Sequence, residues 1–457
     1  MMNRLARSND RGASGSRYLF LLPLLFVLIP YAYAALSGTP EADLSGPAAW
    51  HSAAESVYCA VGATAVTYIL FAEILLTGVA ILASRAYAAR PGSLAVALRE
   101  SGWYLFFFLV LVAVPFIVAW NTESSVCSRG RAFFWESIFI NIFILAILAL
   151  SYNLMFGFGG IVSFGHAAFF GMGVYTVGLL MLHLEWSWWQ ATMAALLVGV
   201  LIALIMGFVG LRIHGLYFAL FTLAFAEVLF LLAGNRILAG ITGAEDGFTF
   251  SVPDWLNTTT NRLFFYYLTL VLLGGAFLLI RRLVSSPTGR VLHALRDNEP
   301  RAQMLGYNTF HFKLIAIVIA GVLASGAGVL RAIALKGASP NVLSLDFTID
   351  PLLMTIIGGM GTFAGPIVGA FALHLTEQFL RDSVLTLGSL QIDVGDFWTF
   401  ILGIIFILSV MIFPQGIVGT WLARRLNTRE GWLRLLHIRR TPNGDELLRE
   451  PEQQRAE

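Results

Sequence analysis

The chain has 457 residues, of which 58% are hydrophobic and 12% are charged, and its formal net charge is +2. Ordinary soluble domains carry about 25% charged residues, so this composition excludes a soluble globular protein. Apolar runs of about 18 or more residues recur along the chain. In lipid, such runs satisfy their backbone hydrogen bonds by forming helices. We therefore expect an all-α polytopic membrane protein. Its partner is the lipid bilayer, and we do not expect it to bind nucleic acid.

Residues 1–132 are expected to form an N-terminal extension with about three membrane helices. Its apolar runs are Tyr18–Leu36, Val57–Leu82 and Trp103–Trp120. Ala32-Tyr33-Ala34 resembles a signal-peptide cleavage site, so the first run is either a cleaved signal or a retained anchor. Cys59 and Cys127 match no metal spacing and would both lie near the outer face, either as a disulfide or as two unpaired thiols.

Residues 133–420 are expected to form a transmembrane core, followed by a polar cytoplasmic tail over residues 421–457. Together with the extension, the core predicts about ten or eleven membrane helices. The core spans are expected at Phe133–Met155, Ala167–Leu182, Trp188–Leu211, Leu216–Ala233, Leu263–Leu283, Leu314–Leu335 and Phe397–Val418. No phosphate-binding loop of the G-x4-GK[ST] type is present, so we expect no ATP hydrolysis by that route on this chain.

The first of two glycine-rich segments runs from Ser151 to Tyr175. Small residues let membrane helices approach closely, and a lone histidine in an apolar span is often only a packed hydrogen-bond donor. Glycines at this density beside polar side chains also predict a broken or re-entrant helix that lines a path. The path candidates of this segment are Gly159, Gly160, Ser163, Gly165 and His166.

The second glycine-rich segment, Pro351–Gln378, holds the path candidates Gly358, Gly359, Gly361 and Gly365. Simple alternation of spans would leave the arginine-rich tail outside, against the positive-inside rule. A re-entrant pair of half-helices over Leu352–Leu380, meeting near Gly361–Pro366, removes this conflict. Interrupted segments in matching positions of two halves are typical of a translocation path, although glycine-rich spans also resemble each other by chance.

Two further positions stand out in the predicted span Leu216–Ala233. Glu227 lies near the middle of this span, where a carboxylate costs about 2.5–3.5 kcal/mol, so it must face a cavity or a partner or be protonated. The alternative is a hydrogen-bond partner between helices. Thr222 lies five residues earlier on the same span, and both residues are path candidates.

The longest expected outside loop, Gly234–Arg262, carries a turn with Thr242, Gly243, Asp246 and Gly247. Glycine and aspartate at this density indicate tight turns. The turn either caps the neighbouring helices or forms an outer docking or gating surface.

The densest charge of the core lies in Ser285–Lys313, where the arginine excess predicts a cytoplasmic loop. Its apolar residues recur with helical spacing, and Pro300 predicts a kink. These apolar residues are Val291, Leu292, Leu295, Met304 and Leu305. The segment is either an ordinary positive-inside loop or an amphipathic helix that docks a soluble partner.

Several motifs in this order across roughly residues 133–419 resemble the LivM-type permease subunit of branched-chain amino acid ABC importers. They are LMFGFGGIVSFGHAAFFG at Leu154–Gly171, GLYFALFTLAFAE at Gly215–Glu227, the turn Thr242–Gly247, SPTGR through RDNE at Ser286–Glu299, and GGMGT at Gly358–Thr362. The resemblance says little about the residues before Arg131.

The resemblance implies a transport subunit that is not itself an enzyme and carries no cofactor or metal. Its partners would be a LivH-like permease, two ABC ATPase subunits that bind ATP and magnesium, and a periplasmic substrate-binding protein, in the bacterial inner membrane. The implied ligand is a branched-chain or related amino acid. A urea or short-amide ABC importer and an ion-coupled secondary transporter are the alternatives.

The resemblance also gives the segment Ser285–Lys313 the role of a coupling helix that docks the ATPases. The usual pattern of such helices is E-A-A-x-x-x-G, whereas this chain has Pro300 in the second place and its glycine one position late. The location is therefore expected, while the exact contact residues stay open. The candidates are Gly289, Arg290, Arg296, Asn298, Glu299, Ala302 and Gly306.

Overall fold

The computed structural model describes residues 131–421 apart from 214, 260, 382–383, 388–389 and 394–396, and a few positions between 108 and 118. The expected spans Tyr18–Leu36 and Val57–Leu82, the two cysteines and the tail beyond Trp421 lie outside the described residues. The predicted boundaries of the N-terminal extension and of the tail therefore stay predictions.

Seven helices of the described part are long and apolar enough to cross a membrane. They are α5 (Arg131–Asn153), α6 (His166–His183), α7 (Trp188–Gly210), α8 (Leu216–Ala233), α10 (Arg262–Val284), α12 (Thr309–Leu335) and α15 (Trp398–Ile412). Each lies where a core span is predicted. The expectation of an all-α polytopic membrane protein is confirmed.

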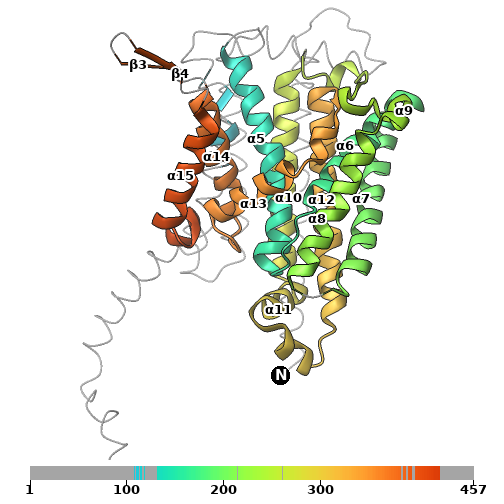
Figure 1. The fold of residues 1–457 in the computed structure, drawn as a ribbon, viewed down its shortest axis with the longest axis vertical. Helices are drawn as coiled ribbons and strands as arrows, with labels where there is room; N and C mark the ends of the chain where they lie inside the picture. The colour runs from blue at the N-terminus through green and yellow to red at the C-terminus, as the bar shows by residue number, and fades with distance from the viewer. Residues whose placement is uncertain are drawn as a thin grey trace, which may run out of the picture.

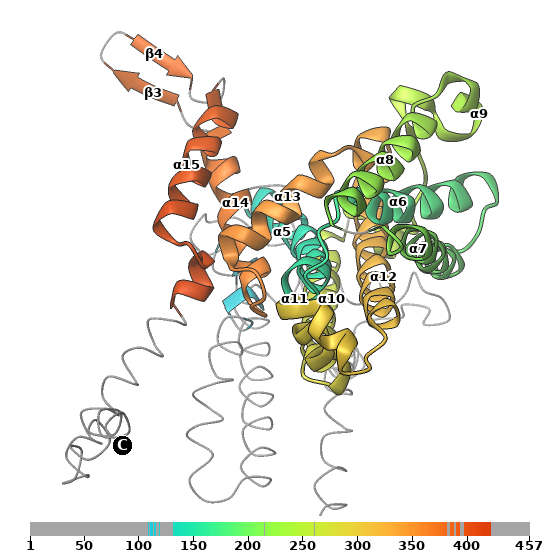
Figure 2. The ribbon, with the colours of Figure 1, turned by 60° about the horizontal axis from the view of Figure 1, so that its bottom comes forward.

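Helix α5 runs through the middle of the bundle, and α6, α7 and α12 form a tightly packed group on one side of it (Figures 1 and 2). Small residues permit this packing. A Cβ on Gly328 of α12 would lie 2.1 Å from the Phe170 carbonyl of α6, and one on Gly199 of α7 would lie 2.7 Å from Ser325 of α12. Of the seven spans, the one that begins with α15 is the least covered by the described residues, with only 6% of its apolar stretch buried.

Both predicted interruptions are present. Helix α5 ends in a π-helical turn, Leu154–Phe158, and the chain stays non-helical until α6 begins at His166. The second segment forms two shorter helices, α13 (Asp346–Gly358) and α14 (Gly365–Arg381), which pack against each other and against α5 (Figure 2). The turn between them falls where the re-entrant pair is predicted, although α13 begins at Asp346 rather than Leu352.

Helix α11 (Pro287–Met304) lies at one end of the bundle, between the end of α10 and the start of α12 (Figure 1). Asn298 has φ −160° and ψ 95° and divides α11 into two pieces. The Asn298 side chain accepts a 3.0 Å hydrogen bond from the Arg301 N–H, so it caps the second piece. The predicted kink is thus confirmed, and it falls at Asn298 because Pro300 cannot donate the hydrogen bond that would continue the first piece and an asparagine serves as a cap.

The opposite end of the bundle is built from short elements. Strands β1 (Phe248–Thr249) and β2 (Gly337–Ala338) pair antiparallel, as do β3 (Val384–Leu387) and β4 (Leu390–Asp393). The remaining pieces are α9 (Ala239–Thr242) and the 3₁₀ turns Arg236–Leu238, Ala244–Asp246, Asp254–Leu256 and Pro340–Leu343. Because of the arginine excess in and beside α11, we expect the end with α11 to be the inner side, and we name the two ends inner and outer on that basis.

Candidate functional site

The two helix breaks meet at Asn153, the last residue of α5. Its side-chain Nδ2 donates a 2.9 Å hydrogen bond to the Thr362 carbonyl, and its Oδ1 accepts a 2.9 Å hydrogen bond from the Gly361 N–H. Asn153 is fully buried, so both side-chain ends find their partners in the turn between α13 and α14. Asn153 is not among the predicted site residues. Its position at the start of a glycine-rich stretch was the only signal.

Arg296 of α11 reaches the same place from the inner side. Its guanidinium donates to the carbonyl of Gly157, inside the π-helical turn. A Cβ on Gly160 would lie 3.2 Å from the Arg296 side chain, and one on Gly361 would lie 2.5 Å from its Nη1. Gly160 and Gly361 have φ of 65° and 74°, a region that favours glycine. Glycine is therefore required at both breaks for the close approach of Arg296.

Aromatic and hydroxyl side chains fix the two breaks further. The Phe158 ring packs against the rings of His293 and Phe363, with centroids 5.5 and 5.3 Å away. Thr362 Oγ1 donates to the Gly359 carbonyl at 2.7 Å and accepts from the Gly365 N–H at 3.0 Å, which caps the start of α14. A Cβ on Gly358 would lie 1.7 Å from the Gly365 carbonyl. Gly358, Gly359, Gly361 and Gly365 thus permit a turn that holds α13 and α14 together.

Polar side chains form hydrogen bonds within the first break and between it and α8. His166 Nε2 lies 2.7 Å from Ser151 Oγ, and Ser163 Oγ accepts a 3.2 Å hydrogen bond from the Gly165 N–H. Thr222 of α8 accepts from the Phe164 N–H at 3.0 Å, and a Cβ on Gly165 would lie 2.3 Å from the Thr222 carbonyl. These side chains are buried. They close the break and join it to α8, and their place on a ligand path stays a prediction.

Glu227 lies apart from the breaks, on the exposed face of α8. No hydrogen bond or ion pair joins its carboxylate to any residue of the described part. The neighbouring residues Val228, Leu231 and Leu232 are also exposed, at 55%, 60% and 47%. This face of α8 is therefore not covered by the described part of the chain.

The coupling candidates in and beside α11 have different surroundings. Gly289 and Ala302 are buried, and a Cβ on Gly289 would lie 2.1 Å from the Val284 carbonyl at the end of α10, so these two anchor α11 to the bundle. Arg290, Asn298 and Gly306 are exposed at the inner end. Glu299 forms an ion pair with Lys313 of α12 at 2.6 Å.

The apolar residues of α11 do not share one environment. Leu292 and Leu295 are buried against the bundle, as an amphipathic helix predicts. Met304 and Leu305 are instead 86% and 71% exposed, and we refer to them as the inner apolar patch. The five apolar residues of the segment are thus divided between the bundle and the exposed surface, and a role of the exposed pair in docking stays a prediction.

The outer turn Thr242–Gly247 is joined to the segment after α12. Gly243 and Gly247 have φ of 73° and 70°, and a Cβ on Gly247 would lie 2.2 Å from the Ala338 carbonyl of β2. Thr242 is buried and donates to the Leu238 carbonyl at 3.1 Å, whereas Asp246 is exposed. The glycines thus have a structural role, and Asp246 is the candidate among the four that a docking protein would meet. Nowhere in the described ranges do three or more His, Cys, Asp or Glu side chains gather in a way that would hold a metal ion.

The spans, the two breaks and the helix held against both of them define a polytopic membrane protein. A family model described as the branched-chain amino acid transport system permease component matches residues 134–410. The chain belongs to this family.

Curated relatives agree with this membership. The chain is 28% identical over 312 residues to the high-affinity branched-chain amino acid transport system permease protein LivM of Salmonella typhimurium, which covers 62% of this chain and 70% of the relative. It is 29% identical over 318 residues to LivM of Escherichia coli, which covers 63% and 72%. The LivH permease protein of Salmonella typhimurium is 23% identical over 299 residues, 60% of this chain and 91% of LivH. No solved structure matches. These matches favour a LivM-type permease over the alternatives of an amide importer or a secondary transporter.

Proposed function

We propose that this chain forms half of the membrane pore of an ATP-driven importer and moves a branched-chain or related amino acid across the bacterial inner membrane. The family match over residues 134–410 carries this proposal. It is supported by the two LivM relatives, which are named for branched-chain amino acid transport.

ATP and magnesium would bind to two ATPase subunits that dock on α11. The inner apolar patch, Met304 and Leu305, supports this docking because such apolar exposure at a polar loop is typical of an interaction surface. Arg290 and Asn298 are exposed on the same helix and are the candidates for polar contacts with the ATPase. Gly289 and Ala302 would act indirectly, by holding α11 against α10 and the rest of the bundle.

Movement of α11 would reach the membrane interior through Arg296. Its guanidinium bonds to Gly157 in the first break and lies against Gly361 in the second. Asn153 connects the two breaks by its hydrogen bonds to Gly361 and Thr362. A displacement of α11 on nucleotide binding would therefore shift both breaks together, which is the kind of two-state element that coupling between distant sites requires.

The second permease subunit would contact the exposed face of α8. Glu227 lies on this face near the middle of the span, and a carboxylate facing lipid at that depth costs about 2.5–3.5 kcal/mol. A polar or cationic group on a LivH-like partner would remove this cost. The similarity of the chain to a LivH permease supports a pair of related subunits arranged about a common path.

A periplasmic binding protein would dock on the outer side, where Asp246 is exposed on the turn Thr242–Gly247. This turn is joined through β1 and β2 to the segment between α12 and α13. Docking would therefore act on the outer ends of both helices. The ligand would then pass between the two permeases and beside the breaks that hold Gly159, Gly160, Gly358 and Gly359.

Affinity purification of the tagged chain from its native membrane tests the proposal. ATPase subunits and a second permease are expected to co-purify, and the complex in proteoliposomes should take up leucine with ATP and the binding protein. Uptake by the single chain without an ATPase, driven by an ion gradient, would contradict the proposal.

A further inference from the structure

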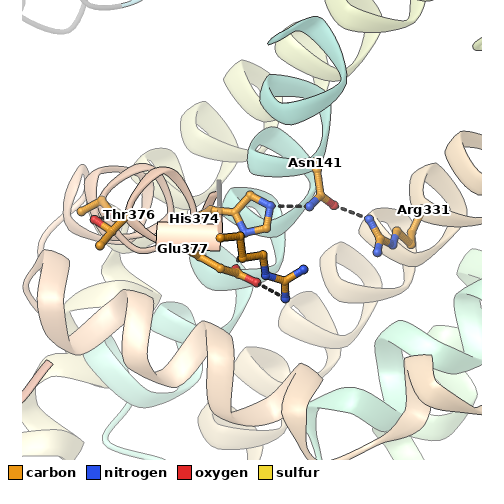
Figure 3. A network of polar contacts seen from close by, with 7 residues as sticks. Asn141, Arg331, His374, Thr376 and Glu377 are labelled. Atoms are coloured by element: carbon orange, nitrogen blue, oxygen red, sulfur yellow. Dashed lines mark hydrogen bonds and ion pairs between the residues drawn. The ribbon is translucent and has the colours of Figure 1, made fainter. Parts of the chain in front are cut away.

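A second polar network lies in the outer half of the bundle, away from the helix breaks (Figure 3). It joins α12, α5 and α14. Arg331 of α12 donates to Asn141 Oδ1 on α5. Asn141 Nδ2 lies 2.6 Å from His374 Nε2 on α14, and His374 Nδ1 lies 3.0 Å from Glu377 Oε2. The other Glu377 oxygen forms a 2.7 Å ion pair with Arg381.

Donors and acceptors in this network have only one consistent arrangement. Because a guanidinium only donates, Asn141 must turn its oxygen toward Arg331 and its NH₂ toward His374. His374 Nε2 must then accept, so the proton of the neutral imidazole lies on Nδ1 and is donated to Glu377. The donors of Arg331, Asn141 and His374 thus all point along the network toward the Glu377 carboxylate. The negative end of the network is satisfied by His374 and Arg381, whereas its positive end is not.

Arg331 uses only a small part of its hydrogen-bonding capacity. A guanidinium can bind a carboxylate with two parallel hydrogen bonds, but Arg331 makes one hydrogen bond, to a neutral amide. Its Nε is buried without an acceptor. None of the ion pairs formed among the described residues includes Arg331. Among the described residues Arg331 therefore has no negative partner, and a largely buried cation without an anion is costly.

Arg262 of α10, another arginine of a membrane span, shows what a satisfied guanidinium looks like in this protein. It donates to the carbonyls of Thr258 and Phe133 and to Ser137 Oγ, and it lies over the Phe133 ring at 3.4 Å. The Arg262 side chain is thus held entirely by its own subunit. The contrast indicates that the missing acceptor of Arg331 is a feature of its site.

The position of Arg331 suits a ligand that arrives from the outer side. It lies in the last turns of α12, shortly before Lys336, and the next residues form β2. Strand β2 pairs with β1, which follows directly on the proposed docking turn Thr242–Gly247. A binding protein on this turn would release its ligand near the outer end of α12.

We propose that Arg331 binds the carboxylate of the transported amino acid as it enters the permease. This inference rests on the proposed function, which supplies a zwitterionic ligand. The carboxylate provides the two acceptor oxygens that the Arg331 guanidinium lacks. Asn141 is a positioning residue that holds the guanidinium, and His374 in turn holds the Asn141 side chain.

The test uses the whole transporter in proteoliposomes, with leucine as the ligand and with Arg331→Gln, Arg331→Lys and the matched control Arg262→Gln. Three quantities are measured for each: leucine uptake, ATP hydrolysis stimulated by the liganded binding protein, and the thermal unfolding midpoint. For Arg331→Gln we expect uptake to fall about tenfold or more, with stimulated hydrolysis and the midpoint retained, because a hydrogen bond to a charged group is lost only in the ligand-bound state. Arg331→Lys keeps the charge and should recover part of the uptake, and Arg262→Gln should keep the ratio of uptake to hydrolysis.

Other outcomes overturn the inference. Unchanged uptake by Arg331→Gln would show that the guanidinium does not contact the ligand. Loss of uptake, hydrolysis and thermal stability together would make Arg331 a structural residue, and loss of the second permease from the complex would place its anion on that subunit. If the unmodified transporter takes up no leucine, the proposed function fails, and a result of this kind is distinct from a defect confined to Arg331 variants.

Discussion

Arg296 of α11 donates a hydrogen bond to the carbonyl of Gly157, in the π-helical turn that ends α5. One side chain from the inner surface thus reaches a helix break inside the bundle. The same guanidinium lies close to Gly361 in the other break. The helix proposed to dock the ATPases is therefore in direct contact with the parts of the membrane domain that are least regular.

Replacement of Arg296 by Gln should separate ATP hydrolysis from transport. A hydrogen bond to a charged group contributes about 1.5–3 kcal/mol, so we expect leucine uptake per ATP hydrolysed to fall about tenfold. The ATPases should still co-purify, because Met304 and Leu305 are unchanged. Arg282→Gln, at an exposed arginine at the end of α10, is the control. An Arg296→Gln transporter with the normal ratio of uptake to hydrolysis would contradict the coupling role of this contact.

Asn153→Ala should destabilise the membrane domain. The substitution leaves the Gly361 N–H and the Thr362 carbonyl without their partner, and each unsatisfied buried group costs about 1–3 kcal/mol. The exposed cap Asn235, which accepts from the Ile237 N–H, provides a comparison, since Asn235→Ala should cost only about 1 kcal/mol. Thermal unfolding in detergent measures both. Equal effects of the two variants would show that Asn153 does not hold the breaks together.

Gly361→Ala and Gly306→Ala form a matched pair that isolates the contact with Arg296. Both glycines have positive φ, 74° and 87°, so an alanine is strained at either position by about 1 kcal/mol. At Gly306 a Cβ meets nothing within 4 Å, whereas at Gly361 it would lie 2.5 Å from Arg296 Nη1. We expect a larger loss of leucine uptake and of thermal stability for Gly361→Ala. A larger loss for Gly306→Ala would refute the importance of close approach at the break.

Leu305→Asp should weaken docking of the ATPases without unfolding the chain. Leu305 is 71% exposed in the inner apolar patch, so a carboxylate there remains solvated in the free subunit but is desolvated in the complex. Ile237→Asp is the control, because Ile237 is 89% exposed on the outer side. The amount of ATPase that co-purifies is the measurement. Equal recovery from both variants would place the docking surface elsewhere.

Cysteine labelling should assign the two sides of the membrane. With Cys59 and Cys127 replaced by Ser, Arg290→Cys is expected to react with an impermeant maleimide only after the membrane is opened, and Asp246→Cys in intact cells or spheroplasts. Both positions are exposed in the structure. The reverse pattern would invert the topology and remove the coupling role of α11.

Much of the fold follows from local sequence. The spans are long apolar runs, and a membrane imposes helix on such runs because no water is present to satisfy the backbone. The second break was predicted because arginine counts decide which side the tail occupies. The kink of α11 follows from Pro300 and its neighbours, but the burial of Ala302 and the exposure of Met304 and Leu305 do not, because burial depends on what packs against each residue.

The contacts on which the proposals rest are formed only in the tertiary structure. Asn153 meets Gly361, Arg296 meets Gly157, and Asn141 meets His374, at sequence separations of 208, 139 and 233 residues. Composition and periodicity indicate how each segment interacts with lipid, with water and with its own neighbours along the chain. They do not determine which faces of distant helices come together, since many packings bury a uniformly apolar helix equally well. Only in the folded bundle does Arg331 become a guanidinium that forms no ion pair with any described residue.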